Sequence, residues 1–93
     1  MAIGIIEIQN LVNAYKVTDL VSKSIECRII HQEKTFGGRL VTVVFESSVS
    51  DLQVAMDLVK KMYQGTTLLK VAEVVPNPPK ELMHYFAKGK FHE

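Results

Sequence analysis

Residue types that define whole classes of protein are scarce in this chain of 93 residues. Tryptophan is absent, and the single cysteine, Cys27, excludes an intrachain disulfide framework and is typical of a reducing compartment. Net charge is nearly absent as well, because eleven lysines and arginines are balanced by ten aspartates and glutamates. We therefore expect neither nucleic acid nor an anionic membrane as a partner.

Long apolar runs are missing too, and none approaches the roughly 20 residues that a membrane-spanning helix requires. The first residues reach the acidic Glu7 too early for a signal peptide, and they lack its basic start. We expect a cytoplasmic protein of one domain. A domain of this length buries only roughly 60 to 65% of the surface that its unfolded chain exposes, so a partner subunit would add to a modest core.

The strongest structural signal is a run of strand-forming residues on either side of two glycines. Gly37 and Gly38 can adopt the positive φ angles of a tight turn, and a segment rich in valine follows them. This pattern predicts a hairpin. The strands predicted from this and similar runs are 2–8, 27–34, 39–46 and 68–75.

Two helices are predicted between these strands. Asn10 caps the first, at 11–25, and Ser50 with Gln53 forms a capping box for the second, which Gly65 ends. Helical spacing also predicts which side chains of the second helix are buried. They are Val54, Ala55, Leu58, Val59 and Met62.

The order of elements predicts an α+β domain of the ferredoxin-like βαββαβ type, with a four-stranded antiparallel sheet and both helices on one face. Charges on both sides of segment 27–34 favour an edge strand or one that meets another subunit. A proline-rich stop then separates the domain, 1–79, from a tail, 80–93. Leu82, Met83 and Phe86 lie at helical spacing and predict a short docked helix in this tail.

Residues that carry chemistry form no recognisable set. His31, His84 and His92 lack the spacing that places two metal ligands on one helix face, so we predict no metal site. His31 is interpreted as a polar interface or surface residue, and Cys27 as a small buried hydrophobe at a helix-to-strand junction. We assign no catalytic residue, no cofactor and no enzymatic activity.

Several segments, taken together and in order, resemble the bacterial microcompartment shell proteins, the BMC domain family. Each segment is short, but their order and intervals match over nearly the whole chain, from Ala2 to about Pro79. The matching segments are Ala2-Ile3-Gly4-Ile5-Ile6-Glu7, Asp19 to Ser24, Glu33-Lys34 before the glycine loop, Leu40-Val41-Thr42-Val43-Val44 after it, and the stop at Pro76-Asn77-Pro78.

The resemblance implies a shell subunit that forms a cyclic homohexamer, tiles with other shell proteins and encloses enzymes. The glycine loop would line a pore for small metabolites on the six-fold axis, and Lys23 would contact the neighbouring hexamer. Lys34 would lie near the pore and the subunit boundary. The pore candidates are Thr35, Phe36, Gly37, Gly38 and Arg39.

Two features differ from the family pattern. The loop is one residue longer than the usual K-x-G-S-G-L, and Asn77 stands where the family has an arginine that takes part in lateral tiling. These departures favour a minor or specialised shell component. The alternative is a ferredoxin-like regulatory module that binds a small metabolite between subunits. In isolation, Lys34 and Arg39 would simply be the exposed cations of a solvated hairpin.

Overall fold

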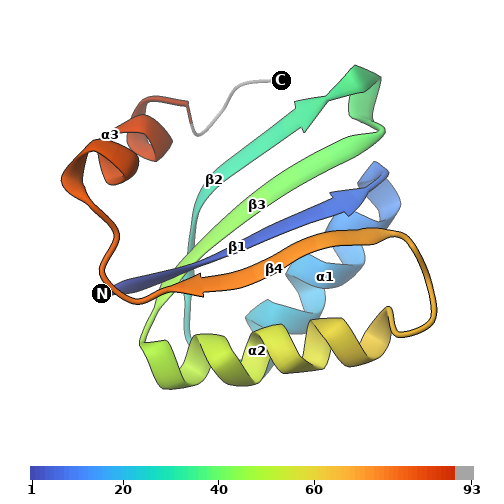
Figure 1. The fold of residues 1–93 in the computed structure, drawn as a ribbon, viewed down its shortest axis with the longest axis horizontal. Coiled ribbons are helices and arrows are strands. Elements are labelled where there is room, and N and C mark those ends of the chain that lie inside the picture. The colour runs from blue at the N-terminus through green and yellow to red at the C-terminus, as the bar shows by residue number, and fades with distance from the viewer. Residues whose placement is uncertain (90–93) are drawn as a thin grey trace.

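The computed structural model describes residues 1–89. Its frame is a four-stranded antiparallel sheet in the order β2-β3-β1-β4 (Figure 1). The predicted edge position of the second strand is confirmed, and the isoleucine-rich first strand lies inside the sheet as predicted, because it pairs with β3 on one side and β4 on the other. The strands are β1 (Ala2–Gln9), β2 (Arg28–Thr35), β3 (Leu40–Ser47) and β4 (Leu69–Val75).

Two helices, α1 (Leu11–Ser24) and α2 (Val49–Met62), cover one face of this sheet, as predicted. A third helix, α3 (Lys80–Gly89), lies on the other face at the end of the sheet near the N-terminus (Figure 1). The helix expected in the tail is therefore present up to Gly89, and His92 lies outside the described residues. The α+β fold class and its βαββαβ order are confirmed.

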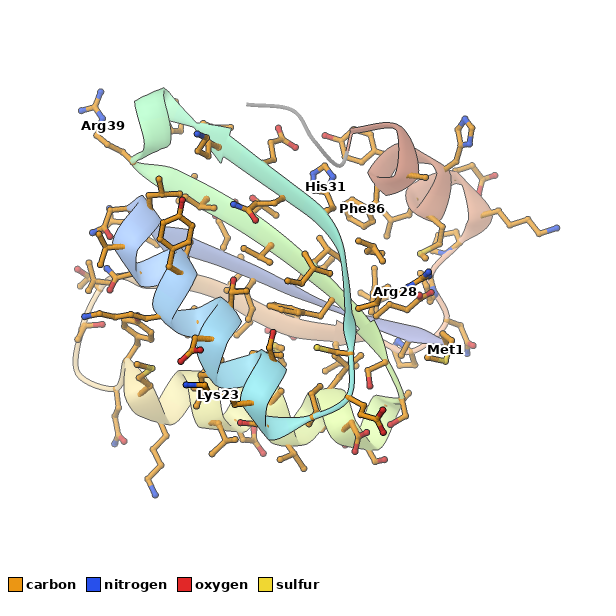
Figure 2. The ribbon with its side chains drawn as sticks, turned by 180° about the vertical axis from the view of Figure 1, so that it is seen from behind. Met1, Lys23, Arg28, His31, Arg39 and Phe86 are labelled. Carbon is orange, nitrogen blue, oxygen red and sulfur yellow. The ribbon has the colours of Figure 1, made fainter. Side chains whose placement is uncertain are left out.

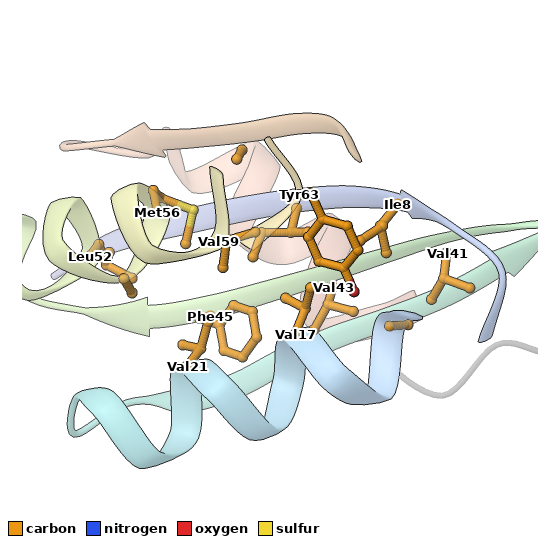
Figure 3. Close-up of a cluster of buried hydrophobic side chains, with 14 of the residues drawn as sticks. Ile8, Val17, Val21, Val41, Val43, Phe45, Leu52, Met56, Val59 and Tyr63 are labelled. Carbon is orange, nitrogen blue, oxygen red and sulfur yellow. The ribbon is translucent and has the colours of Figure 1, made fainter. Parts of the chain in front are cut away.

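The main core lies between the sheet and the helices α1 and α2 (Figure 3). Alternation along β3 directs Val43 and Phe45 toward these helices, where Val17 of α1 and Val59 of α2 cover them. Each of these side chains is fully buried, and each contributes roughly 1.5 to 3 kcal/mol by leaving water. The core accordingly fixes how both helices sit on the sheet.

The start of α2 differs from the prediction. Ser48, not Ser50, caps the helix, and its hydroxyl accepts a hydrogen bond from the backbone N–H of Asp51 at 3.2 Å. Asp51 then lies in the first turn, where the helix dipole favours a carboxylate. Ser50 therefore belongs to the helix and is exposed.

The prediction of which α2 side chains are buried is also partly wrong. Two sets of apolar residues on this helix have helical spacing, and only contact with the sheet selects between them. The residues that face the sheet are Leu52, Ala55, Met56 and Val59. The expected core residues Val54, Leu58 and Met62 are instead exposed on the flank of the helix.

His31 was interpreted as a polar interface or surface residue, and the structure shows that it is not on the surface of the domain. A β-bulge shifts the register of β2 between Ile29 and His31, so that Ile29 lies opposite Phe45 and His31 opposite Val44. His31 thereby turns to the face that α3 covers, and its exposed fraction is only 2%. The bulge could not be read from the residue pattern alone.

Candidate functional site

The loop between β2 and β3 is a tight turn at Phe36–Gly38, and all three of its residues have positive φ angles rather than those of a right-handed 3-10 helix. The positive φ angles expected of the glycines are confirmed, at 65° for Gly37 and 88° for Gly38. Phe36 also has a positive φ, 53°, which costs a residue with a Cβ roughly 1 to 2 kcal/mol. Its side chain is 71% exposed. A strained backbone therefore holds a bulky aromatic ring in solvent.

Hydrogen bonds fix the loop from several directions. Arg39 donates twice to the carbonyl oxygen of Phe36, from its backbone N–H at 3.3 Å and from Nε at 3.1 Å. The Arg39 carbonyl oxygen accepts from the backbone N–H of Asn10 at 3.0 Å, and the Thr35 hydroxyl lies 3.4 Å from the Leu40 carbonyl oxygen. The loop is consequently tied to the connection between β1 and α1.

Asn10, at that connection, confirms its predicted role as a helix cap. Its side-chain oxygen accepts a hydrogen bond from the backbone N–H of Asn13 at 3.0 Å. Its backbone angles, φ 62° and ψ 156°, lie outside the left-handed helical region that asparagine tolerates, in a region populated almost only by glycine, so the backbone is strained here. The Asn13 side chain in turn donates to the Gln9 carbonyl oxygen at 3.1 Å. The start of α1 and the loop therefore form one hydrogen-bonded unit.

Hollows lie on two sides of Phe36. The first, of about 450 Å³, is lined by three charged side chains, one amide and the apolar Phe36 and Leu40. The second, of about 370 Å³, lies between the loop, Lys34 of β2 and Leu11 of α1. The charged and amide residues of the first hollow are Glu7, Gln9, Arg39 and Lys70.

The other candidate site residues predicted from the sequence lie in two different parts of the domain. Lys34 pairs with Val41 of β3, one ladder step from the loop. Lys23 lies in the last turn of α1, with its Nζ 3.0 Å from Oδ2 of Asp19, and Asn77 is exposed in the connection after β4. The structure thus groups Lys34 with the loop and leaves Lys23 and Asn77 apart from it.

Strand directions show that these two places are at opposite ends of the sheet. The loop adjoins the end of β1, where Gln9 lies opposite Leu40, whereas β4 ends beside the start of β1, where Ile3 lies opposite Val75. Helix α1 runs from the loop end toward the other end, and Figure 2 shows Lys23 far along it from Arg39. One domain therefore carries the loop at one end and Lys23 and Asn77 toward the other.

A cluster under α3 was not predicted. Nε2 of His31 lies 3.0 Å from Oε1 of Glu33, and the Tyr85 hydroxyl donates to the same oxygen at 3.2 Å. The His31 ring packs against Phe86, with ring centres 4.9 Å apart. The Glu33 carboxylate raises the pKa of Tyr85. The spacing of His31 and Glu33 was visible in the sequence, but Tyr85 and Phe86, which contact them, lie about fifty residues later, so no local pattern joined the four residues.

Within residues 1–89, no three or more histidine, cysteine, aspartate or glutamate side chains are grouped so that they could hold a metal ion. Cys27 lies at the predicted helix-to-strand junction between α1 and β2 but is only half-buried. Burial raises the pKa of its thiol, although a hydrogen bond with Ser22 opposes this. The neutral thiol is a weak nucleophile. No helix within residues 1–89 is long and apolar enough to cross a bilayer.

Comparison with known proteins gives the family of this chain. The model of the BMC domain family matches residues 2–78. The chain is 27% identical over 88 residues to the bacterial microcompartment shell protein PduA of Citrobacter freundii and to PduA of Salmonella typhimurium strain LT2. These alignments cover 95% of this chain and 94% and 93% of the two relatives.

A solved structure shares the fold. A microcompartment protein from Desulfitobacterium hafniense DCB superposes with a TM-score of 0.76 at 14% sequence identity. The match covers 95% of this chain and 47% of the other, so the chain spans about half the length of that protein. The family match over most of the chain, with the resemblance of its segments, identifies this protein as a member of the BMC domain family of bacterial microcompartment shell proteins.

Proposed function

We propose that this chain is a structural subunit of a bacterial microcompartment shell in the cytoplasm and assembles as a ring of six identical copies. Its curated relatives are named shell proteins and align along nearly their whole length. In the proposed ring, the loop from Thr35 to Arg39 surrounds the axis and forms a pore for small metabolites. Other shell proteins and the enclosed enzymes are its proposed partners.

The observation that carries this proposal is the distribution of residues along the domain. A subunit of a closed ring that also tiles needs one end at the axis and the other at the periphery. The loop lies at one end of the sheet, and Lys23 and Asn77 lie toward the opposite end. The longest dimension of the domain, 33 Å, is sufficient to separate the two kinds of contact.

The loop chemistry suggests how such a pore discriminates. Symmetry would bring six copies of Phe36 and Arg39 together, and both side chains are exposed. A ring of aromatic side chains narrows an opening, and a ring of guanidinium groups lowers the energy of an anion within it. We propose a narrow pore that favours anionic over cationic solutes.

We propose no catalytic role for this subunit. The most reactive candidate groups are poorly suited to one, because the Cys27 thiol has a raised pKa and His31 is buried beneath α3 against Glu33. Asn77 replaces the arginine expected for lateral tiling, so we propose that the protein is a specialised component whose sheets are less regular than those of a major shell protein.

The mass of the protein in solution tests the proposed ring. Light scattering after size-exclusion chromatography should give about 63 kDa for six chains of 10.5 kDa. Electron microscopy of the concentrated protein should then show extended layers. A stable monomer, dimer or trimer would refute the ring and favour the alternative, a regulatory module that binds a small metabolite between subunits.

A further inference from the structure

We infer that the hollow beside Phe36 is a binding site for a small molecule that carries a carboxylate close to an ammonium or hydroxyl group, such as a small amino acid or hydroxy acid. The hollow has a volume of about 450 Å³, within the range of small-ligand sites. This inference deepens the proposed function, because Phe36 and Arg39 belong to the pore loop and the site would name the class of solute that the pore admits.

The charged groups around the hollow lack partners in the domain. Within residues 1–89, neither Lys70 nor Glu7 makes an ion pair or a side-chain hydrogen bond. The Arg39 guanidinium donates only from Nε, to the Phe36 carbonyl oxygen, so its two terminal nitrogens have no acceptor among residues 1–89. A carboxylate ligand would satisfy the two cations, and arginine can bind it with two parallel hydrogen bonds.

Glu7 defines the second half of the ligand. Its side chain is partly buried in the hollow beside the two cations, and a carboxylate there would repel a simple anion. An ammonium or hydroxyl group on the ligand would instead donate to it. Gln9, on the same face of β1, adds an amide that can donate and accept. Two cations, one carboxylate and one amide together favour a ligand with both an acceptor and a donor end.

Backbone irregularities direct these side chains. The register between β1 and β4 shifts after Glu7, so that Val71 lies opposite Glu7 and Leu69 opposite Ile8. Lys70 is the extra residue of this β-bulge, and bulges are common beside functional sites because they redirect a side chain. Phe36 is held at the other wall by its positive φ angle. One strained residue, Phe36, and one β-bulge, at Lys70, therefore border the same hollow.

Ligand-observed saturation-transfer NMR on the full-length protein tests this inference at low ionic strength, in a buffer free of carboxylates and phosphate. The probes are L-alanine, with both charged groups, propionate, with the carboxylate only, and propylamine, with the ammonium only. We expect L-alanine to bind with the lowest Kd. Lys70→Met should raise this Kd on the order of tenfold, as expected for the loss of one charge-assisted hydrogen bond.

Glu7→Gln provides a sharper test, because it should selectively remove the preference for L-alanine over propionate. Lys61→Met is the matched control, since Lys61 is an exposed lysine of α2 on the other side of the sheet and should leave all three affinities unchanged. Absence of L-alanine binding, or binding that is insensitive to Lys70→Met and Glu7→Gln, overturns the inference.

Light scattering on the same samples separates this result from the proposed function. A six-chain ring that binds no L-alanine refutes the site and leaves the proposed ring intact. The same holds if a neighbouring subunit of the ring fills the hollow and so prevents binding. A lower oligomer that binds L-alanine supports the site and refutes the ring.

Discussion

The hydroxyl of Tyr63, just after α2, donates a hydrogen bond to the side-chain oxygen of Asn13 in α1 at 3.0 Å. Both residues are buried, and burial raises the pKa of the Tyr63 hydroxyl. The Asn13 amide also donates to the Gln9 carbonyl oxygen. This contact joins the end of one helix to the start of the other beneath the candidate site.

Replacing Tyr63 by phenylalanine should therefore destabilise the domain. Tyr63→Phe leaves a buried amide oxygen without its donor, which costs about 1 to 2 kcal/mol. Urea unfolding followed by circular dichroism measures this change. Tyr15→Phe is the matched control, because the Tyr15 side chain is exposed and makes no hydrogen bond with residues 1–89, so its stability should equal that of the wild type.

The docking of α3 should depend on one side chain. Phe86 packs on Ile3 and Val44 and against the His31 ring, whereas Tyr85 beside it is exposed. Phe86→Ala removes this buried ring, so we expect the amides of α3 to exchange with deuterium at least tenfold faster. The amides of β1 should keep their protection. Equal exchange in α3 of the variant and the wild type would show that other contacts hold the helix.

Cys27 should make the folded state less stable as the pH becomes alkaline. Burial raises the pKa of its thiol in the folded state, so folding favours the neutral form. This contribution is complete below the pKa of the unfolded thiol, roughly 8.5, and is lost as the pH rises through the folded pKa. The Tm should fall more between pH 7 and pH 10 for the wild type than for Cys27→Ala. Identical slopes would contradict the effect of burial.

Lys23 should affect assembly without affecting stability. Its ion pair with Asp19 is exposed and contributes at most a few tenths of a kcal/mol. If Lys23 contacts the neighbouring ring as proposed, Lys23→Ala should abolish extended layers in electron micrographs while the ring mass is retained. Lys61→Ala is the control. Layers that persist in the Lys23 variant would remove this role.

Arg39 should set the charge preference of the proposed pore. A layer deposited over a solid-state nanopore and placed under a KCl gradient gives the ratio of chloride to potassium permeability from the reversal potential. Arg39→Gln should lower this ratio several-fold, because it removes one positive charge from each copy at the opening. Arg39→Lys retains the charge and should preserve the ratio. An unchanged ratio in Arg39→Gln would refute the proposed selectivity.

Much of the fold could be predicted from local signals. Asn10 caps α1 as expected, Gly37 and Gly38 adopt positive φ angles, and the prolines end the last strand. These outcomes depend on the conformational preferences of single residues and their near neighbours. The capping of α2 was predicted wrongly because Ser48 and Ser50 are both competent caps, and only the packing of Leu52 and Met56 on the sheet decides between them.

The sequence by itself determined the order of elements, the glycine turn and the family, because each depends on residue types in a linear pattern. Tertiary structure alone decided what lies together across long separations. It buried His31 beneath α3 through a bulge, and it brought Lys70 beside Glu7 and Arg39 through another. Bulges and strand pairing depend on the total packing energy of the sheet, and no local pattern encodes that sum.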